Sequence, residues 1–400
     1  MSRVGPVLIV LLLCSSLVGC FSDEEVEQEE GYVWQEKEEI NCQTPTNEDL
    51  ICSEYLTGFV TPVSSLLHPT LEELWIVDLS GNISAWNGES IRNVADLTDI
   101  VSTCHYEQGL LGLEFDQNFA ETGNVLLSYV ENGSCEGPNK SRLILAEASV
   151  EDGQIHNSSL NTLRAIEQPY RNHNGGHLLG IGNNQYLWGL GDGGGSKDPH
   201  QNGQNKSNPH GAIHLFHYFN NTISPVVNGS DSDPYILHSG LRNPWKFDVD
   251  PNGGLWIADV GQSCWEEINL VPVLEPTNLG WSEMEGFYEF DPDSNCEENT
   301  GSGNEAYTDP VAVYSHDSGA HCSISGGHWM DWGPEVLQDG YLYGDFCSGA
   351  IWVIKENENG SWIPELIDNS GTMIVGFGRG LNDELLIFSW AGAIYQLTEI

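Results

Sequence analysis

The sequence has 400 residues, of which 39% are hydrophobic, and it contains 13 Trp, 14 Tyr and 12 Phe. This composition is typical of a folded chain with a sizeable core, so disordered and fibrous classes are excluded. Asp and Glu number 59 against 13 Lys and Arg, which gives a formal net charge of −46. Nucleic-acid binding depends on cationic contacts to phosphate, so this charge excludes DNA and RNA as partners.

The first 19 residues are typical of an export signal of the lipoprotein type. Val7 to Leu13 form an apolar run that is too short to span a bilayer. The sequence Leu17-Val18-Gly19-Cys20 resembles a lipobox, which predicts cleavage before Cys20 and a lipid on its sulfur. The alternative is an ordinary cleaved signal in which Cys20 is incidental. We expect an exported protein, lipid-anchored to the outer face of the cell membrane or free in the periplasm or extracellular space.

Residues 20–50 are predicted to be an acidic tether, because Asp23 to Glu30 hold six acids in eight positions. No later stretch is apolar enough to cross a membrane, so the lipid is the only membrane contact that the sequence predicts. The folded domain is expected to occupy residues 51–400.

Eight cysteines remain after Cys14 and Cys20 are set aside. An even number in an exported chain indicates disulfides, and no spacing suggests zinc. Eight cysteines allow 105 pairings, so the sequence alone leaves the connectivity open. Pairing by local order favours Cys42–Cys52, Cys104–Cys135, Cys264–Cys296 and Cys322–Cys347, the last most strongly.

Short apolar and aromatic runs bounded by Gly, Asn and Asp recur along the chain and predict an all-β protein. Six of these runs resemble one another, and their starts are 44 to 86 residues apart: Leu74 to Asp78, Val125 to Tyr129, Tyr186 to Leu190, Leu255 to Asp259, Tyr341 to Asp345 and Leu385 to Ser389. One four-stranded blade per run predicts a six-bladed β-propeller. A pair of β-sandwiches is the alternative, although sandwiches do not repeat one strand motif six times.

Polar segments that would converge at one end of a propeller channel carry a family resemblance. In chain order they are Glu107-Gln108-Gly-Leu-Leu-Gly-Leu113, Asn172-His173-Asn-Gly-Gly-His177, Gly191-Asp192-Gly-Gly-Gly195 with Asp198-Pro-His200, Gly240-Leu-Arg242-Asn243-Pro-Trp245, Asp259 to Asn269, Asn278-Leu-Gly-Trp281, Met284-Glu-Gly286, Tyr314-Ser-His316-Asp317 and Tyr343 to Gly349. Together they resemble the pyrroloquinoline quinone (PQQ)-dependent soluble glucose/sorbosone (aldose sugar) dehydrogenase family over about residues 57 to 398.

The resemblance implies PQQ and calcium at the channel mouth, and oxidation of an aldose sugar hydroxyl by hydride transfer to the quinone, with an external electron acceptor. His173 matches the family's general base, and Asp192 matches the carboxylate that orients it. Arg242 and Asn243 match the pair that faces the cofactor, and Gln108 matches a residue near the substrate.

The same resemblance implies calcium ligands. Gly261 and Gln262 match positions that give backbone oxygens, and Glu266 stands near a family carboxylate. Asp192 and Asp198 could instead form a second ion site with Asn202. The loop Asp291-Pro-Asp293-Ser-Asn295 imitates a calcium loop but lacks the Gly and distal Glu of an EF-hand.

Two departures separate the chain from the best-known branch of the family. There a Lys and two Arg near the C-terminus hold the cofactor's carboxylates, whereas here Cys347 falls at the Lys position and residues 371–380 offer only Arg379. The segment Tyr343-Gly-Asp-Phe-Cys-Ser-Gly349 resembles the disulfide-containing branch, which includes noncatalytic propellers of hedgehog-interacting type. The alternative function is therefore a propeller that binds carbohydrate or a protein partner at the same mouth. A calcium-stabilised hydrolase is weaker, because no Ser/His/Asp arrangement stands out.

Overall fold

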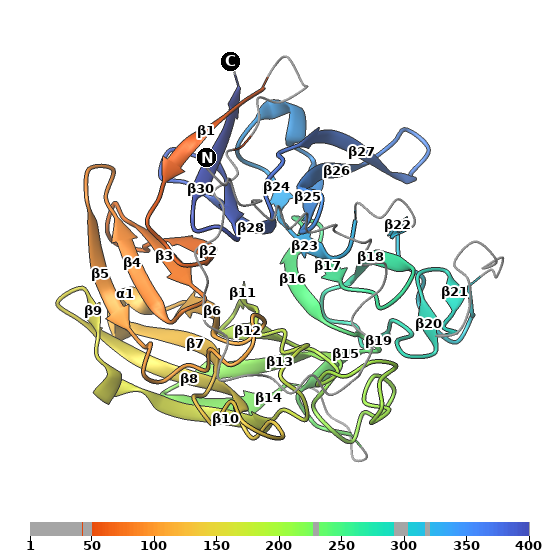
Figure 1. Ribbon diagram of the computed structural model, residues 1–400, viewed down its shortest axis with the longest axis horizontal. Helices are drawn as coiled ribbons and strands as arrows, with labels where there is room; N and C mark the ends of the chain where they lie inside the picture. Colours follow the sequence, from red (N-terminus) through yellow and green to blue (C-terminus); the bar gives the residue numbers. More distant parts are fainter. Residues whose placement is uncertain (1–41, 43–49, 227–231, 292–302, 317–320, 400) are drawn as a thin grey trace, which may run out of the picture.

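The computed structural model describes residues 42, 50–226, 232–291, 303–316 and 321–399. In these residues six β-sheets of at least four strands surround a central axis, as Figure 1 shows, and the predicted six-bladed propeller is confirmed. Each sheet is one blade, and its first four strands pair in an antiparallel arrangement from the channel outward. The sheets follow one another around the axis in chain order.

The innermost strands line the channel. Because the chain enters every blade at its innermost strand and the first four strands within a blade are antiparallel, the innermost strands all run in the same direction along the channel. They are β2 (Pro62–Leu67), β6 (Leu110–Phe115), β11 (Leu178–Gly182), β16 (Pro244–Val249), β23 (Ile324–Gly326) and β28 (Ile374–Arg379). The segment that precedes each of these strands therefore reaches the same end of the channel. This shared end is the mouth at which the predicted site residues were expected.

The second strand of every blade is one of the six runs that the sequence singled out. These strands are β3 (Leu74–Asp78), β7 (Asn124–Val130), β12 (Gln185–Leu190), β17 (Gly254–Asp259), β25 (Gly340–Asp345) and β29 (Leu385–Ser389). Each blade lies between two others, so both faces of these strands are covered and they are apolar runs rather than alternating ones. Trp75, Trp188 and Trp256 are fully buried in three of them.

The outer strands complete the blades. The third strands are β4 (Asn82–Trp86), β8 (Arg142–Glu151), β13 (Ala212–Phe219), β18 (Trp265–Pro272), β26 (Ala350–Glu356) and β30 (Ile394–Glu399). The fourth are β5 (Ile91–Asp96), β10 (Asn161–Glu167), β15 (Ile236–Ser239), β22 (Ala312–Ser315), β27 (Trp362–Asn369) and β1 (Leu50–Leu56). The remaining short elements are α1 (Phe119–Thr122), β9 (Gln154–Ile155), β14 (Thr222–Pro225), β19 (Thr277–Asn278), β20 (Met284–Glu285), β21 (Tyr288–Glu289), β24 (Trp329–Met330) and the 3-10 turns Asn157–Ser159 and Glu335–Leu337.

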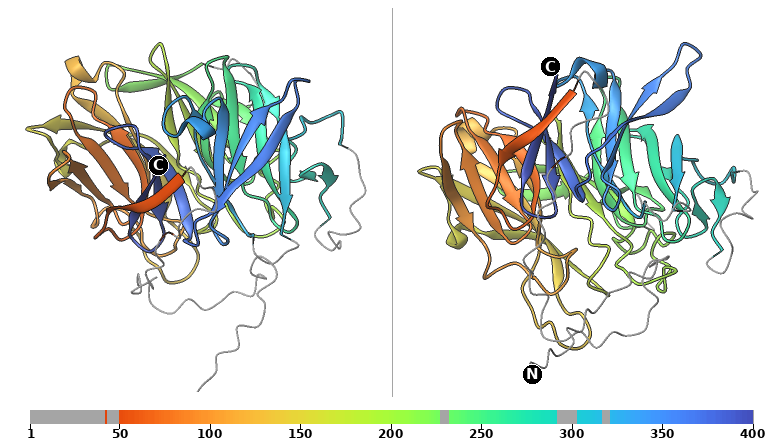
Figure 2. Two further views of the ribbon diagram at one scale, coloured as in Figure 1. Left: turned by 90° about the horizontal axis from the view of Figure 1, so that it is seen from above. Right: turned by 45° about the horizontal axis from the view of Figure 1, so that its top comes forward.

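The ring is closed by the two ends of the described chain. β1 pairs antiparallel with β30, from Leu50 opposite Glu399 to Leu56 opposite Ile394. Figure 2 shows β1 lying beside the C-terminal strand. The sixth blade thus takes its outer strand from the beginning of the domain and its inner three from the end, which leaves no unpaired edge between the termini.

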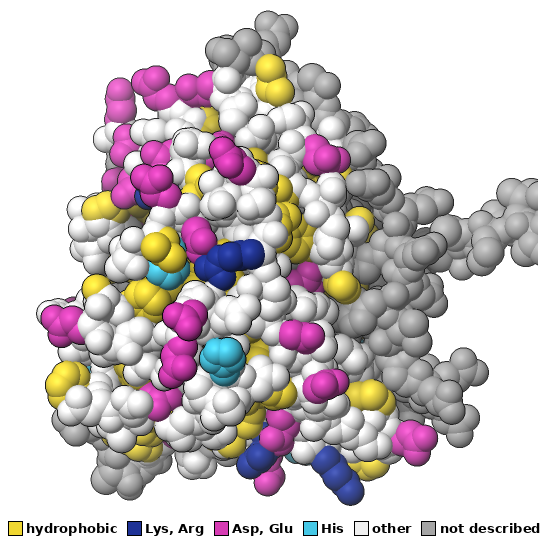
Figure 3. Space-filling model, turned by 90° about the vertical axis from the view of Figure 1, so that its left-hand side faces the viewer, with side chains coloured by type: hydrophobic (Ala, Val, Ile, Leu, Met, Phe, Trp, Pro, Cys, Tyr) yellow, Lys and Arg dark blue, Asp and Glu magenta, His cyan; other side chains and the backbone are white. Residues whose placement is uncertain are grey.

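Three predicted disulfides are confirmed: Cys42–Cys52, Cys104–Cys135 and Cys322–Cys347. Cys264 is also disulfide-bonded, but its predicted partner Cys296 lies outside the described residues. So do the signal segment 1–19, Cys20, nearly all of the tether 20–50, and positions 292–295 of the calcium-like loop. Within the described ranges, no helix has the length and apolar character needed to cross a membrane. On the face shown in Figure 3, acidic side chains are spread widely among few basic ones.

Candidate functional site

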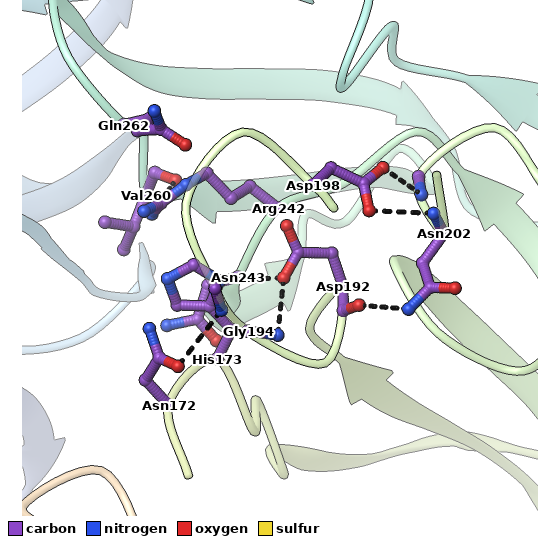
Figure 4. Close-up of polar contacts among 12 residues, drawn as sticks. Asn172, His173, Asp192, Gly194, Asp198, Asn202, Arg242, Asn243, Val260 and Gln262 are labelled. Carbon is purple, nitrogen blue, oxygen red and sulfur yellow. Dashed lines mark hydrogen bonds and ion pairs between the residues drawn. The ribbon is translucent and has the colours of Figure 1, made fainter. Parts of the chain in front are cut away.

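The predicted base and orienting carboxylate meet at the channel mouth. His173 lies five residues before β11, and Asp192 lies two residues after the end of β12. Nδ1 of His173 is 2.7 Å from Oδ1 of Asp192, and the side chains are 5% and 0% exposed (Figure 4). Because a carboxylate accepts, it fixes the tautomer with the proton on Nδ1 and leaves Nε2 as an acceptor. Nε2 has no hydrogen-bond partner in the described part of the chain.

Asp192 is held in its charged form by several donors. Oδ1 also accepts from the Gly194 amide at 2.9 Å, and Oδ2 accepts from Nε1 of Trp281 at 2.9 Å. Burial acts to raise the pKa of this carboxyl, but the charges of His173 and Arg242 and these hydrogen bonds hold the pKa below its ordinary value. A carboxylate that stays ionised stabilises the imidazolium that forms when His173 takes a proton.

The backbone around His173 is fixed by a second carboxylate. His173 has φ 55°, an uncommon conformation for a residue with a side chain. Its amide donates to Oε2 of Glu107 at 2.6 Å, and the Gly175 amide donates to Oδ1 of Asn243 at 3.1 Å. Gly191 packs against the His173 backbone so closely that a Cβ there would clash. The imidazole is therefore aimed by contacts from three other segments.

Arg242 and Asn243 are positioned just before β16 by one buried acid. Asp259, at the end of β17, accepts from the Arg242 amide at 2.9 Å and from the Asn243 amide at 2.7 Å. Burial raises the pKa of Asp259 to about 7. The guanidinium of Arg242 donates to the Val260 carbonyl at 3.1 Å and lies 5.6 Å from the Trp281 ring, while its Nε has no partner in the described residues.

Gln108 lies on the same side of the ring, two residues before β6. It is fully buried, and its Oε1 accepts from Oγ of Ser102 at 2.7 Å. Its Nε2 is buried and has no partner in the described residues. Twelve buried side-chain polar atoms lack a partner in the described residues, and two of them, Nε of Arg242 and Nε2 of Gln108, are donors at this mouth that a ligand oxygen could pair.

The three predicted calcium ligands lie in and after the loop that joins β17 to β18, but Glu266 faces donors. Its carboxylate is fully buried and accepts from the Ile324 amide at 2.9 Å, the Gly261 amide at 3.3 Å and Nε2 of His316 at 2.6 Å. Burial raises the pKa of Glu266. Burial acts to lower the pKa of His316, but the hydrogen bond to Glu266 and its charge outweigh this effect, so the pKa of His316 is raised. Oε1 of Gln262 accepts from the Lys197 amide at 2.5 Å.

At the alternative ion site, the side chains of Asp198 and Asn202 are likewise engaged in hydrogen bonds with other groups of the protein. Asp198 accepts from the amides of Asn202 and Gly203 at 2.8 and 2.9 Å, and the Asn202 side chain donates to the Asp192 carbonyl at 2.6 Å. Figure 4 shows these hydrogen bonds beside Asp192. Across the described ranges, no group of three or more His, Cys, Asp or Glu side chains could hold a metal ion.

Neither of the positions compared with the family's C-terminal cations, Cys347 and Arg379, places a cation at this mouth. Cys347 is bonded to Cys322. Arg379 ends β28, whereas the mouth lies at the strand's beginning, so Arg379 is at the opposite end of the channel, where its Nε pairs with Asp383 at 2.7 Å.

Sequence reasoning missed three contributors to the site. Glu107 and Trp281 lie inside segments that the resemblance quoted, yet their hydrogen bonds to His173 and Asp192 cross 66 and 89 residues. Glu285 accepts from the amides of Gln262, Ser263 and Cys264 and so shapes the predicted calcium loop. No local spacing signals contacts of this range.

Comparisons with known proteins agree with the fold and the ordered motifs. The profile of the family "Glucose / Sorbosone dehydrogenase" matches residues 61–341. HIPL2 protein of Arabidopsis thaliana is 28% identical over 334 residues, covering 68% of this chain and 47% of that protein. Quinoprotein glucose dehydrogenase B of Acinetobacter calcoaceticus is 26% identical over 245 residues, covering 54% of this chain and 49% of that protein. The chain thus spans about half the length of the curated relatives it matches.

Solved structures show the same architecture. The soluble aldose sugar dehydrogenase of Escherichia coli in its apo form has a TM-score of 0.69 at 18% identity, covering 88% of this chain and 100% of that one. The PQQ-bound aldose sugar dehydrogenase of Streptomyces coelicolor has a TM-score of 0.66 at 17% identity, covering 89% and 100%. At these identities the likeness establishes the propeller fold.

Proposed function

Because this chain belongs to the glucose/sorbosone dehydrogenase family, we propose that it oxidises a hydroxyl of an aldose sugar at the channel mouth, with PQQ as the cofactor. The observation that carries the proposal is the His173–Asp192 pair, which leaves Nε2 of His173 without a partner in the described chain, at the same end of the channel as Arg242 and Gln108. His173, Arg242 and Gln108 each lie in the segment that precedes an innermost strand, so all three belong to the same end of the channel. An external acceptor would take the electrons onward.

The residues present fit a quinone ligand. Nε of Arg242 and Nε2 of Gln108 are buried donors without partners in the described chain, and both suit oxygen acceptors. When bound, PQQ supplies a quinone that accepts a hydride from the alcohol carbon. The fixed charge of Arg242, held by the Val260 carbonyl and the Trp281 ring, would stabilise negative charge that develops on ligand oxygens.

His173 would take the hydroxyl proton on Nε2. Removal of hydride from an alcohol carbon requires loss of the hydroxyl proton, and an imidazole is suited to accept it near neutral pH. The charge of Asp192 would stabilise the resulting imidazolium, and the Glu107 contact to the His173 amide would keep the ring in place. Asn243 would act on the same loop by holding Gly175.

Calcium would be held by the backbone carbonyls of Gly261 and Gln262. Carbonyl oxygens are suitable ligands for this cation. The carboxylate of Glu266 would have to exchange at least one of its three donors, His316 among them, to join them. We place this chemistry outside the cytoplasm, since disulfides persist in oxidising compartments, with Cys20 as the lipidated residue.

A noncatalytic propeller that binds carbohydrate or protein is the second candidate. It is favoured by the disulfide at Cys347 and by the position of Arg379, which leave the family's C-terminal cation positions without a cation at the mouth. The same mouth residues would then be contacts rather than catalysts.

A dye-reduction assay separates the two functions. Purified protein is supplied with PQQ and calcium, and reduction of an artificial dye is followed with a panel of aldoses. Sugar-dependent reduction is expected from the wild type and not from a sample without PQQ. A wild type that binds no PQQ at any calcium concentration and reduces no dye would refute the enzymatic proposal.

A further inference from the structure

Lys246 is a cation buried in the channel wall without a counter-ion. It lies on β16, three residues past Asn243, which is roughly 10 Å along the strand from the mouth. The residue is 6% exposed and is the one buried lysine in the described ranges. In those ranges its amine forms neither a hydrogen bond nor an ion pair; its one polar contact is the face of the Trp245 ring, 5.3 Å away.

The neighbouring acid on the strand is engaged elsewhere. Oδ2 of Asp248 accepts from Nδ1 of His328 at 3.2 Å and from the Trp329 amide at 3.0 Å. Oδ1 of Asp248 accepts from the Val249 amide at 2.8 Å. Desolvation lowers the pKa of Lys246 to about 8, so the amine is still largely protonated at neutral pH.

The channel wall is shaped to admit this side chain. Gly326 on β23 lies directly against its Cβ, so that any side chain at 326 would clash with it. Gly376 on β28 faces the far end, where an added Cβ would be 3.8 Å from Cε of Lys246. The lysine therefore extends from the fourth blade toward the fifth and sixth. Nε1 of Trp245 donates to the Val375 carbonyl at 2.8 Å and fixes the ring under the amine.

Burial of an unpaired cation costs free energy unless a partner supplies the opposite charge. The described chain supplies no such partner, in a protein whose surface is strongly acidic. We propose that the Lys246 amine binds a carboxylate of an aromatic ligand that extends from the mouth into the channel. The inference rests on the proposed function in that the ligand would be PQQ, which carries carboxylates. Lys246 would then provide, from the fourth blade, the cation that positions 347 and 379 do not.

The test compares PQQ affinity in four proteins by quenching of tryptophan fluorescence: wild type, Lys246→Met, Lys246→Arg and Lys355→Met. Lys355 is the matched control, because its amine donates to the Val336 carbonyl on the outer part of the fifth blade. Loss of a charge-assisted contact predicts a Kd about ten- to a hundredfold higher in Lys246→Met, partial retention in Lys246→Arg and no change in Lys355→Met. The Tm of Lys246→Met should be at least as high as that of the wild type, because the substitution removes an unpaired buried charge. Thermal unfolding measures it.

A second readout needs no cofactor. Lys246 is acetylated with acetic anhydride, and its modification is followed by mass spectrometry with isophthalate or inorganic phosphate present. Protection by isophthalate supports a carboxylate site even if the wild type binds no PQQ, in which case only the proposed function fails. If the wild type binds PQQ and Lys246→Met binds it equally well, the inference is overturned while the function stands. If PQQ does not bind and isophthalate does not protect, or phosphate alone protects, the inference is also overturned.

Discussion

At the scale of single residues, the side chains at the mouth differ in whether all of their polar atoms have partners within the described chain. Asp198 and Asp259 direct both carboxylate oxygens at backbone amides, so they fix the segments that carry Asp192 and Arg242. His173 and Gln108 instead keep one polar atom free of partners in the described chain.

His173→Ala should reduce sugar-dependent dye reduction by about 10²- to 10⁴-fold, the range expected for loss of a general base. PQQ affinity should stay near the wild-type value, because the imidazole acts on the hydroxyl proton. Steady-state kinetics and fluorescence titration measure the two quantities. His200→Ala is the control, since His200 is exposed and its ring contact is to Tyr170. Equal turnover in His173→Ala and the wild type would exclude His173 as the base.

Arg242→Ala should differ from His173→Ala by weakening both turnover and PQQ binding. The guanidinium interacts with ligand charge before and during hydride transfer, so its loss affects the ground state and the transition state. Arg379→Ala is the matched control at the other end of the channel. Unchanged PQQ affinity in Arg242→Ala would show that Arg242 does not touch the cofactor.

The raised pKa of Glu114 should make the free energy of unfolding depend on pH. Its carboxylate on β6 accepts from the amides of Phe115 and Gly180, and burial raises its pKa to about 7. Between the unfolded value near 4.5 and about 7, the folded state binds more protons, so the free energy of unfolding falls as pH rises through this window. The contribution of this group is at most about 3 kcal/mol. Urea unfolding from pH 4.5 to 8 should show a shallower fall for Glu114→Gln than for the wild type and for Glu121→Gln, the exposed control; parallel curves would contradict the assignment.

At the scale of elements, the sequence predicted what is locally encoded. The six second strands were found because blade stacking buries both faces and makes each strand an apolar run. The strand β1 was not anticipated, because its role depends on pairing with β30 about 340 residues away. The contacts of Trp281 and Glu107 and the burial of Lys246 escaped prediction for the same reason, since they arise only when separate blades meet.

The Cys322–Cys347 disulfide ties the segment before β23 to the turn after β25. The two cysteines are 25 residues apart, so the chain-entropy estimate gives about 3 to 4 kcal/mol of stabilisation. Replacing both residues by Ser should lower the free energy of unfolding by up to this amount, measured by urea denaturation. Reduction of the wild type under mild conditions should move its midpoint toward that of the double variant. Free thiols at both positions in protein purified without reductant would contradict the bond.

At the scale of the whole molecule, the propeller is a closed ring whose closure joins its two ends. Leu50 is buried at the start of β1, and Cys52 links this strand to Cys42. The main-chain groups of β30 that face β1 are satisfied by that strand. In this ring the sixth blade is where strands from the two ends of the domain, β1 and β30, pair. The stability of the whole propeller should therefore depend on this blade.

Deletion of residues 1–58 should therefore destabilise the propeller, whereas deletion of residues 1–41 should not. The longer deletion removes β1 and the Cys42–Cys52 bond and exposes the edge of β30. Loss of a few kcal/mol predicts a Tm lower by roughly 3–6 °C in a domain of this size. An unpaired edge strand also promotes association between copies, which size-exclusion chromatography would detect. The shorter deletion keeps Cys42 and all of β1, so it controls for loss of the acidic segment. Equal Tm values for the two truncated proteins would show that the ring does not depend on closure by β1.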